Sequence, residues 1–160
     1  MKILVPVDGS KASENAAKKA FEIAKMYNAA VKIITVVDTG DLPKIGSSER
    51  RWQQMSGAMI ITPVAEELPA IRDKMKIRAE EILEGILSQV DAEGIKTEKR
   101  VLVGEPDQVI ADTVLQDKID LVVMGNRGFS GKRRFFVGSV TERVIAEVTC
   151  PVLVVHTDPE

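Results

Sequence analysis

The chain is poor in sulfur ligands and in aromatic residues. Its 160 residues include one cysteine, Cys150, one histidine, His156, and only 4% aromatic residues. A single cysteine excludes an internal disulfide, and one cysteine with one histidine cannot build a Cys/His zinc site within one chain. We therefore expect Cys150 to be a packing residue and His156 to be incidental to the chemistry.

Long apolar runs are also missing. No stretch approaches the ~20 residues that a membrane span needs, and residues 1–8 lack the cleavage site of a secretory signal. The net charge of −2 argues against a general nucleic-acid-binding surface. We expect a cytoplasmic protein with neither a membrane nor a nucleic acid as partner, folded as a single domain over residues 1–160.

Short apolar segments alternate with amphipathic ones along the chain. Strands are expected at 3–7, 31–37, 97–103, 120–124 and 151–155, and helices up to about 28, at about 66–92, after 104–107 and at 140–147. This alternation predicts an α/β fold, a five-stranded parallel sheet with helices on both faces. A strand order of 3-2-1-4-5 would bring Asp8 and Gly125 together where such sheets bind ligands.

Residues from about 39 to 65 interrupt this pattern. They show no sustained period and contain several glycines and prolines, which predicts a long irregular insertion. Its apolar residues, Trp52 among them, argue against pure disorder. The segment is interpreted first as a loop folded over its own apolar residues, with a ligand lid or a dimer arm as alternatives.

A glycine-rich loop over residues 125–139 gives the clearest functional signal. Gly125 and Gly128 would let backbone N–H groups approach an anion, and Gly138 and Ser139 would open a helix whose N-terminal N–H groups are unpaired. Ser139 and Glu142 also form the pattern of a capping box. The loop carries four cationic side chains and no acidic one, namely Arg127, Lys132, Arg133 and Arg134.

Each of these residues also has a structural interpretation. Asp8 is a common turn former, the first two glycines could only make a tight turn, and Ser139 could only cap a helix. Residues 132–134 are more typical of a solvated loop than of a phosphate contact. The occurrence of all these features in one loop favours an anion site.

The spacing Gly125-x2-Gly128-x9-Gly138-Ser139, after a strand ending in Met124, resembles the nucleotide-binding signature of the universal stress protein family. Further similarity lies in segments 5–10, 103–106 and 151–155. The resemblance implies the adenine nucleotide alpha hydrolase-like, or Rossmann-like, fold. It also implies binding of ATP, with Mg²⁺ or Mn²⁺ held through the phosphates rather than by protein ligands.

The resemblance further implies a role for each matching residue. Asp8 would bind the ribose. Backbone and apolar contacts to adenine would come from Pro6, Val7, Val36 and Met124. Contacts to the phosphates would come from Gly125, Arg127, Gly128, Gly138, Ser139, Val140 and Thr141. Asn126 departs from the small hydroxyl residue expected at its position.

The function implied is that of an ATP-dependent regulatory or stress-response module whose protein partner is unknown. An apolar strand at 152–155 on a sheet edge favours a homodimer, as the family suggests. No residue in the loop is an evident catalytic base, so no catalytic residue is predicted. A slow ATPase or phosphotransferase is the alternative, and a nucleotide-independent interaction protein is the second alternative.

Overall fold

The computed structural model describes residues 1–38, 40, 68–126 and 137–157. Its centre is a five-stranded sheet in the order β3-β2-β1-β4-β5, with every neighbouring pair parallel. The strands are β1 (Lys2–Pro6), β2 (Ala30–Asp38), β3 (Thr97–Gly104), β4 (Leu121–Gly125) and β5 (Val152–Val155). The predicted strand order is confirmed, and each strand end lies within one residue of its expected position.

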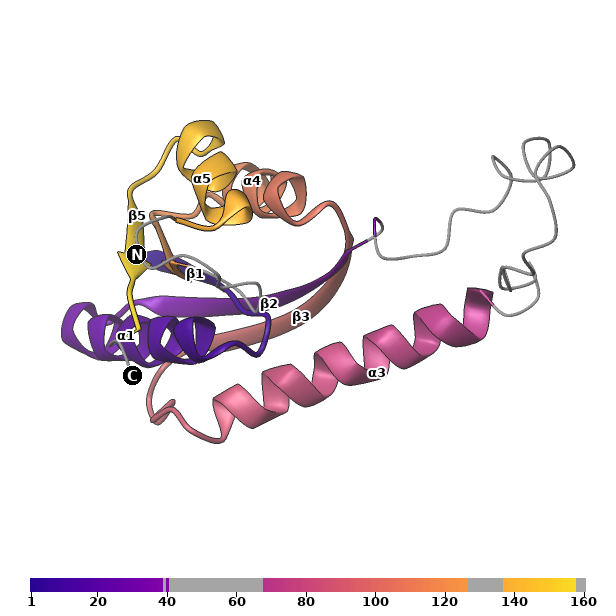
Figure 1. Cartoon of the computed structure of the whole chain (residues 1–160). Coiled ribbons are helices and arrows are strands. Elements are labelled where there is room, and N and C mark those ends of the chain that lie inside the picture. Colours follow the sequence, from indigo (N-terminus) through magenta and orange to yellow (C-terminus); the bar gives the residue numbers. More distant parts are fainter. Residues whose placement is uncertain (39, 41–67, 127–136, 158–160) are drawn as a thin grey trace, which may run out of the picture.

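Helices cover both faces of the sheet, as predicted. Helices α1 (Lys11–Tyr27) and α3 (Leu68–Leu87) lie on one face, and α4 (Pro106–Asp117) and α5 (Ser139–Glu147) lie on the other (Figure 1). Successive strand residues point to opposite faces, so each strand contributes to two cores. Val5 and Val123 join the core under α1 and α3, whereas Leu4 and Val122 join the core under α4 and α5.

The first helix is fixed at both ends by its local sequence. At the N-cap, the Ser10 hydroxyl accepts a hydrogen bond from the Ser13 amide at 3.3 Å. At the other end, Asn28 adopts a left-handed conformation with φ of 50°, and its N–H donates to Ala24. The inward face consists mainly of alanines, whose small side chains let α1 lie close to the sheet.

One helix differs in length from the sequence expectation. Helix α3 ends at Leu87 rather than near Ala92, and its most buried side chain is that of Leu83. The first half of α3 extends past the sheet, which leaves Met75 half-buried (Figure 1). In α4, Ile110 and Val114 are buried, whereas Leu115 is exposed. None of the helices within the described residues is both long and apolar enough to cross a membrane.

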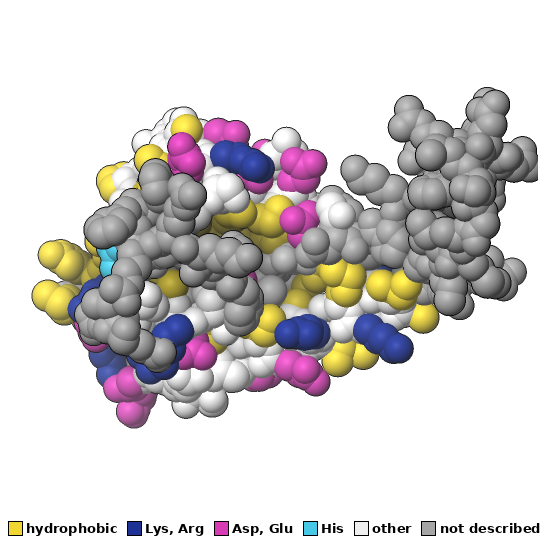
Figure 2. Space-filling model, viewed as in Figure 1, with side chains coloured by type: hydrophobic (Ala, Val, Ile, Leu, Met, Phe, Trp, Pro, Cys, Tyr) yellow, Lys and Arg dark blue, Asp and Glu magenta, His cyan; other side chains and the backbone are white. Residues whose placement is uncertain are grey.

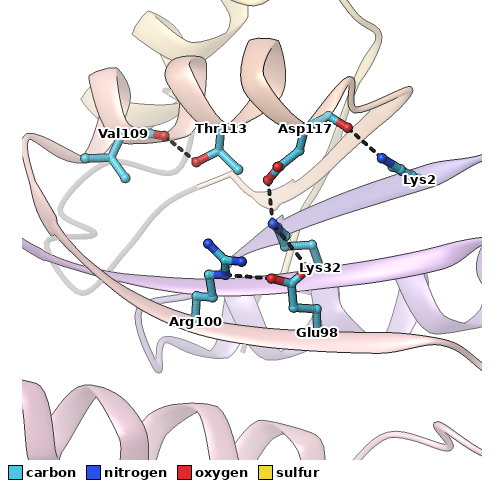
Figure 3. A network of polar contacts seen from close by, with 7 residues as sticks. All are labelled: Lys2, Lys32, Glu98, Arg100, Val109, Thr113 and Asp117. Carbon is cyan, nitrogen blue, oxygen red and sulfur yellow. Dashed lines mark hydrogen bonds and ion pairs between the residues drawn. The ribbon is translucent and has the colours of Figure 1, made fainter.

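A network of ion pairs joins α4 to the sheet at the amino ends of the strands. Figure 3 shows Lys32 of β2 between Asp117 of α4 and Glu98 of β3. Lys32 is buried and would be unfavourable without these partners. The Lys2 ammonium donates to the Asp117 carbonyl oxygen at 2.9 Å, and the hydrogen bond from Lys32 holds the pKa of the Asp117 carboxyl below its usual value.

Cys150 packs at the edge of the core under α4 and α5, as expected. Partial burial raises the pKa of its thiol. The expected insertion at 39–65 lies outside the described residues, apart from Gly40, whose amide donates to Asp38 at 2.7 Å.

Candidate functional site

The carboxyl ends of β1 and β4 lie side by side, because β1 pairs directly with β4. Chain order changes direction between these two strands, since β2 and β3 extend the sheet on one side and β5 on the other. Ligands of open α/β sheets bind at this kind of position. The sheet therefore brings the Asp8 turn, the residues after β4 and the start of α5 to one edge.

An apolar floor is formed at this edge by Pro6, Val36 and Met124. These residues come from β1, β2 and β4, which are neighbours in the sheet. All three lie on the α4 and α5 face: Val36 and Met124 belong to that core, and Pro6 follows from the alternation after Leu4. Hydrophobic side chains are visible in the hollow between the α4 and α5 layer and the sheet (Figure 2). A flat apolar ligand group would fit against such a floor.

Val7 is separated from this floor. Its side chain is buried in the opposite core, under α1 and α3, and its amide donates to Ile34 at 2.8 Å. A ligand on the α4 and α5 face can therefore meet Val7 only through its backbone. The apolar contact implied for Pro6, Val36 and Met124 does not extend to the Val7 side chain.

Asp8 forms a turn, which is one of the two roles considered for it. One carboxylate oxygen, Oδ1, accepts hydrogen bonds from the Ser10 amide at 2.9 Å and from the Ser10 hydroxyl at 2.6 Å. These bonds hold the turn between β1 and α1, in which Gly9 takes a φ of 82°. Asp8 is exposed, and no described residue donates to its Oδ2. That oxygen can accept from ligand hydroxyl groups.

Gly125 has a packing role that its sequence context did not reveal. A Cβ atom at this position would lie 2.7 Å from both the carbonyl carbon and the Cβ of Ala12. Only a glycine lets the first turn of α1 approach the end of β4 this closely. The close approach in turn brings the Asp8 turn next to the residues that follow β4.

The capping box predicted for Ser139 and Glu142 is wrong. The N-cap of α5 is Gly138, which has no side chain to cap the helix, and Ser139 is the first helical residue. Within the described part of the chain, no side chain accepts from the first-turn amides of α5. N–H groups at the start of a helix, together with the positive end of its dipole, are an arrangement that suits an anion.

The structure describes three of the other residues predicted to contact the phosphates and does not describe the rest. Ser139 is exposed and Val140 half-buried at the start of α5. The Thr141 hydroxyl is buried and donates to the Gly125 carbonyl oxygen at 3.0 Å, so its backbone N–H is the group left for a ligand. Arg127 and Gly128 lie outside the described residues, as do Lys132, Arg133 and Arg134.

Asn126 connects the elements around the site, a role that sequence reasoning missed. Its amide donates to Val155 at 2.9 Å, and its carbonyl oxygen accepts from the Gly138 amide at 2.7 Å. The side-chain Nδ2 lies 3.2 Å from Nδ1 of His156. Asn126 thus ties β4 to β5 and to the N-cap of α5. The sequence feature that could have indicated this role is the position of Asn126, a polar residue directly after a buried strand.

Two other features bear on possible binding sites. A shallow hollow of about 460 Å³ beside α3 is lined by Lys74, Ile77, Arg78, Glu81 and Ile82, and it lies on the face of the sheet opposite the apolar floor. In the ranges that the structure describes, no three His, Cys, Asp or Glu side chains are grouped as metal ligands.

Comparison with known proteins shows which family has this sequence and architecture. The model of the universal stress protein family matches residues 1–156. Universal stress protein MJ0531 of Methanocaldococcus jannaschii is 36% identical over 155 residues, which are 96% of this chain and 81% of that protein.

Solved structures of the same family are also similar. A universal stress protein in complex with cAMP is 27% identical with a TM-score of 0.66, and the match covers 99% of this chain and 98% of that one. The universal stress protein of Archaeoglobus fulgidus in complex with dAMP is 25% identical with a TM-score of 0.63, over 97% of each chain.

Proposed function

The chain belongs to the universal stress protein family, and from this premise we propose that it is a nucleotide-dependent regulatory protein that binds ATP as a homodimer in the cytoplasm. One observation carries the proposal. The apolar floor of Pro6, Val36 and Met124 lies at the same edge of the sheet as the N-terminus of α5, which no described side chain caps. Together they offer an adenine surface and a phosphate site.

Each part of the nucleotide has a matching group at this edge. Adenine would lie on the apolar floor, with the Val7 backbone beside it. The ribose hydroxyl groups would donate to Oδ2 of Asp8, whose Oδ1 already holds the turn. The phosphates would accept from the amides of Ser139, Val140 and Thr141 at the start of α5. This division accounts for adenine nucleotides as ligands of similar proteins.

The charge of the loop after β4 favours a triphosphate. Residues 125–139 contain four cationic side chains and no acidic one, more than a monophosphate needs for neutralisation. A divalent cation would bind through the phosphate oxygens, as Mg²⁺ commonly does with few protein ligands. The sequence places Arg127 and Gly128 in the same loop, and their phosphate contacts are part of this proposal.

The homodimer is proposed from the position of β5. This strand forms one edge of the sheet, and Leu153 is exposed on it. Pairing with a second copy would cover the free backbone groups of the edge. Sedimentation at micromolar concentration tests the assembly: a species of twice 17.5 kDa is expected, and a monomer contradicts the homodimer.

Calorimetric titration of the nucleotide-free protein with ATP and Mg²⁺ tests the main proposal. We expect micromolar binding, with weaker binding of AMP and cAMP because they offer fewer phosphate oxygens. Heats equal to those of dilution would leave a nucleotide-independent interaction protein as the better explanation. Incubation of the saturated protein with ATP separates a binding module from a slow ATPase, since only the latter releases phosphate.

A further inference from the structure

Asp107 is a buried carboxylate that neither the apolar floor nor the phosphate site includes. It lies in the first turn of α4 and is 4% exposed. Nη1 of Arg143, on α5, lies 3.3 Å from one of its carboxylate oxygens and 3.5 Å from the other. A buried charge is unfavourable unless it is paired, so Asp107 depends on Arg143 and on the N-terminal end of the α4 dipole.

This ion pair is the one polar side-chain link between α4 and α5 among the residues that the structure describes. The remaining contact between the two helices is apolar, through residues such as Ile110 and Val144. Apolar contacts are non-directional and specify the relative position of two helices less narrowly than a hydrogen bond does. A charge-assisted hydrogen bond with a buried acceptor fixes the relative position of the helices more narrowly.

The N-terminus of α5 needs such a fixed position. Its N-cap, Gly138, has no side chain to hold it, and no side chain orders its first-turn amides in the described structure. On the β4 side, α5 is held by the hydrogen bonds of Thr141 to Gly125 and of Gly138 to Asn126. On the α4 side, it is held by Arg143, one turn after the amides that face the proposed phosphates.

We propose that Asp107 is a positioning residue that acts through Arg143 to fix the N-terminal turn of α5, and thereby sets the phosphate-dependent part of the nucleotide affinity. This inference rests on the proposed ATP binding at α5. Arg143 does not itself bind phosphate in this arrangement, because its charge is directed to Asp107. The adenine floor belongs to the sheet and does not depend on the pair.

The test compares ATP with adenosine, which lacks phosphates. In Asp107→Asn and in Arg143→Met, ATP affinity should fall about tenfold while adenosine affinity stays within a factor of about two. The double variant should lose no more than either single variant, because one interaction is removed in all three. Arg143→Lys, which keeps the charge, should recover part of the loss. Lys19→Met is the matched control, since it removes a cation from the Lys19–Glu22 pair on the outer face of α1.

Each other outcome is decisive. Equal losses for ATP and adenosine would mean general destabilisation and would overturn the inference, as would a rise in ATP affinity, which would assign phosphate binding to Arg143. Additive losses in the double variant would also overturn it. Wild-type protein that binds neither ligand would overturn the proposed function and this inference together. Should Asp107→Asn fail to fold, Arg143→Lys decides. A ratio of ATP to adenosine affinity below that of the wild type supports the inference, and a wild-type ratio overturns it.

Discussion

At the amino ends of the strands, charged side chains are paired with one another, whereas at the carboxyl ends hydrogen-bonding groups are left available. Lys32, Asp117 and Glu98 satisfy each other at the first end. At the second end, the α5 amides lack a side-chain cap and no described residue donates to Oδ2 of Asp8. The comparison teaches that the network joins elements of the fold, while the other edge carries the polar groups that we propose for ligand binding.

The connections between elements follow the same division. The chain returns from helix to strand at the amino ends through 28–29, 88–96, 118–120 and 148–151, all of which the structure describes. Both long connections, 39–67 and 126–138, start from the carboxyl ends of strands. Binding residues of α/β proteins are concentrated in such strand-to-helix connections, because the sheet behind them provides a rigid support.

Gly138→Val should have the largest effect and separate the two ends most sharply. Gly138 has a φ of −66° and a ψ of 153°, which valine also adopts, so the fold should persist. The new side chain would occupy the space in front of the α5 amides, and ATP affinity should fall by about a hundredfold or more in calorimetry. Wild-type affinity in a folded Gly138→Val protein would refute the placement of the phosphates.

Gly125→Ala tests the close packing at the carboxyl end. The added Cβ would meet Ala12 at 2.7 Å and push α1 away from β4. We expect the free energy of unfolding to fall by about 2 kcal/mol in urea denaturation. Adding Ala12→Gly should restore only part of the loss, because the clash with the Ala12 carbonyl carbon remains. Unchanged stability of the single variant would show that α1 moves freely.

Asp117→Asn tests the paired end of the sheet. The pKa of Asp117 is lower in the folded protein than its ordinary value of 3.8, so its ionised form stabilises the fold above pH 3.8. At pH 7 the variant should be less stable by about 1 kcal/mol, the upper range for pairs open to solvent. This difference should shrink as the pH falls below 3.8 and vanish below the lowered pKa.

The same variant is the binding control for the comparison. ATP affinity of Asp117→Asn should equal that of the wild type, because Asp117 lies at the amino ends of the strands and the N-terminus of α5 lies at their carboxyl ends. A large loss of affinity would mean that the two ends are coupled. A stability difference that persists at low pH would mean that Asp117 acts through packing rather than charge.

Gly85→Ala should have the smallest effect and the opposite sign. Gly85 lies inside α3, and a Cβ there would have no neighbour within 4 Å. Alanine lowers the conformational entropy of the unfolded chain and should stabilise the protein by about 0.5–1 kcal/mol in thermal or urea unfolding. A destabilised variant would show that Gly85 is needed for a contact not visible in the fold.

Local sequence patterns predicted the elements well because they depend on neighbouring residues. The strand ends and the packing of Cys150 are confirmed. One local prediction failed because a backbone contact between more distant residues replaced it. Ser139 with Glu142 matches a capping box, yet the chain enters α5 one residue earlier, where the amide of Gly138 bonds to Asn126.

By itself, the sequence determined the alternation of strands and helices and the glycine spacing of the loop after β4, since both follow from residue types at fixed separations. The tertiary structure decided which residues meet. Pairing of β1 with both β2 and β4 brought Pro6, Val36 and Met124 together on one face, while the alternation of side chains put Val7 in the opposite core. Packing of α4 on α5 joined Asp107 to Arg143, 36 residues apart, because a contact at that separation depends on how whole helices lie on the sheet.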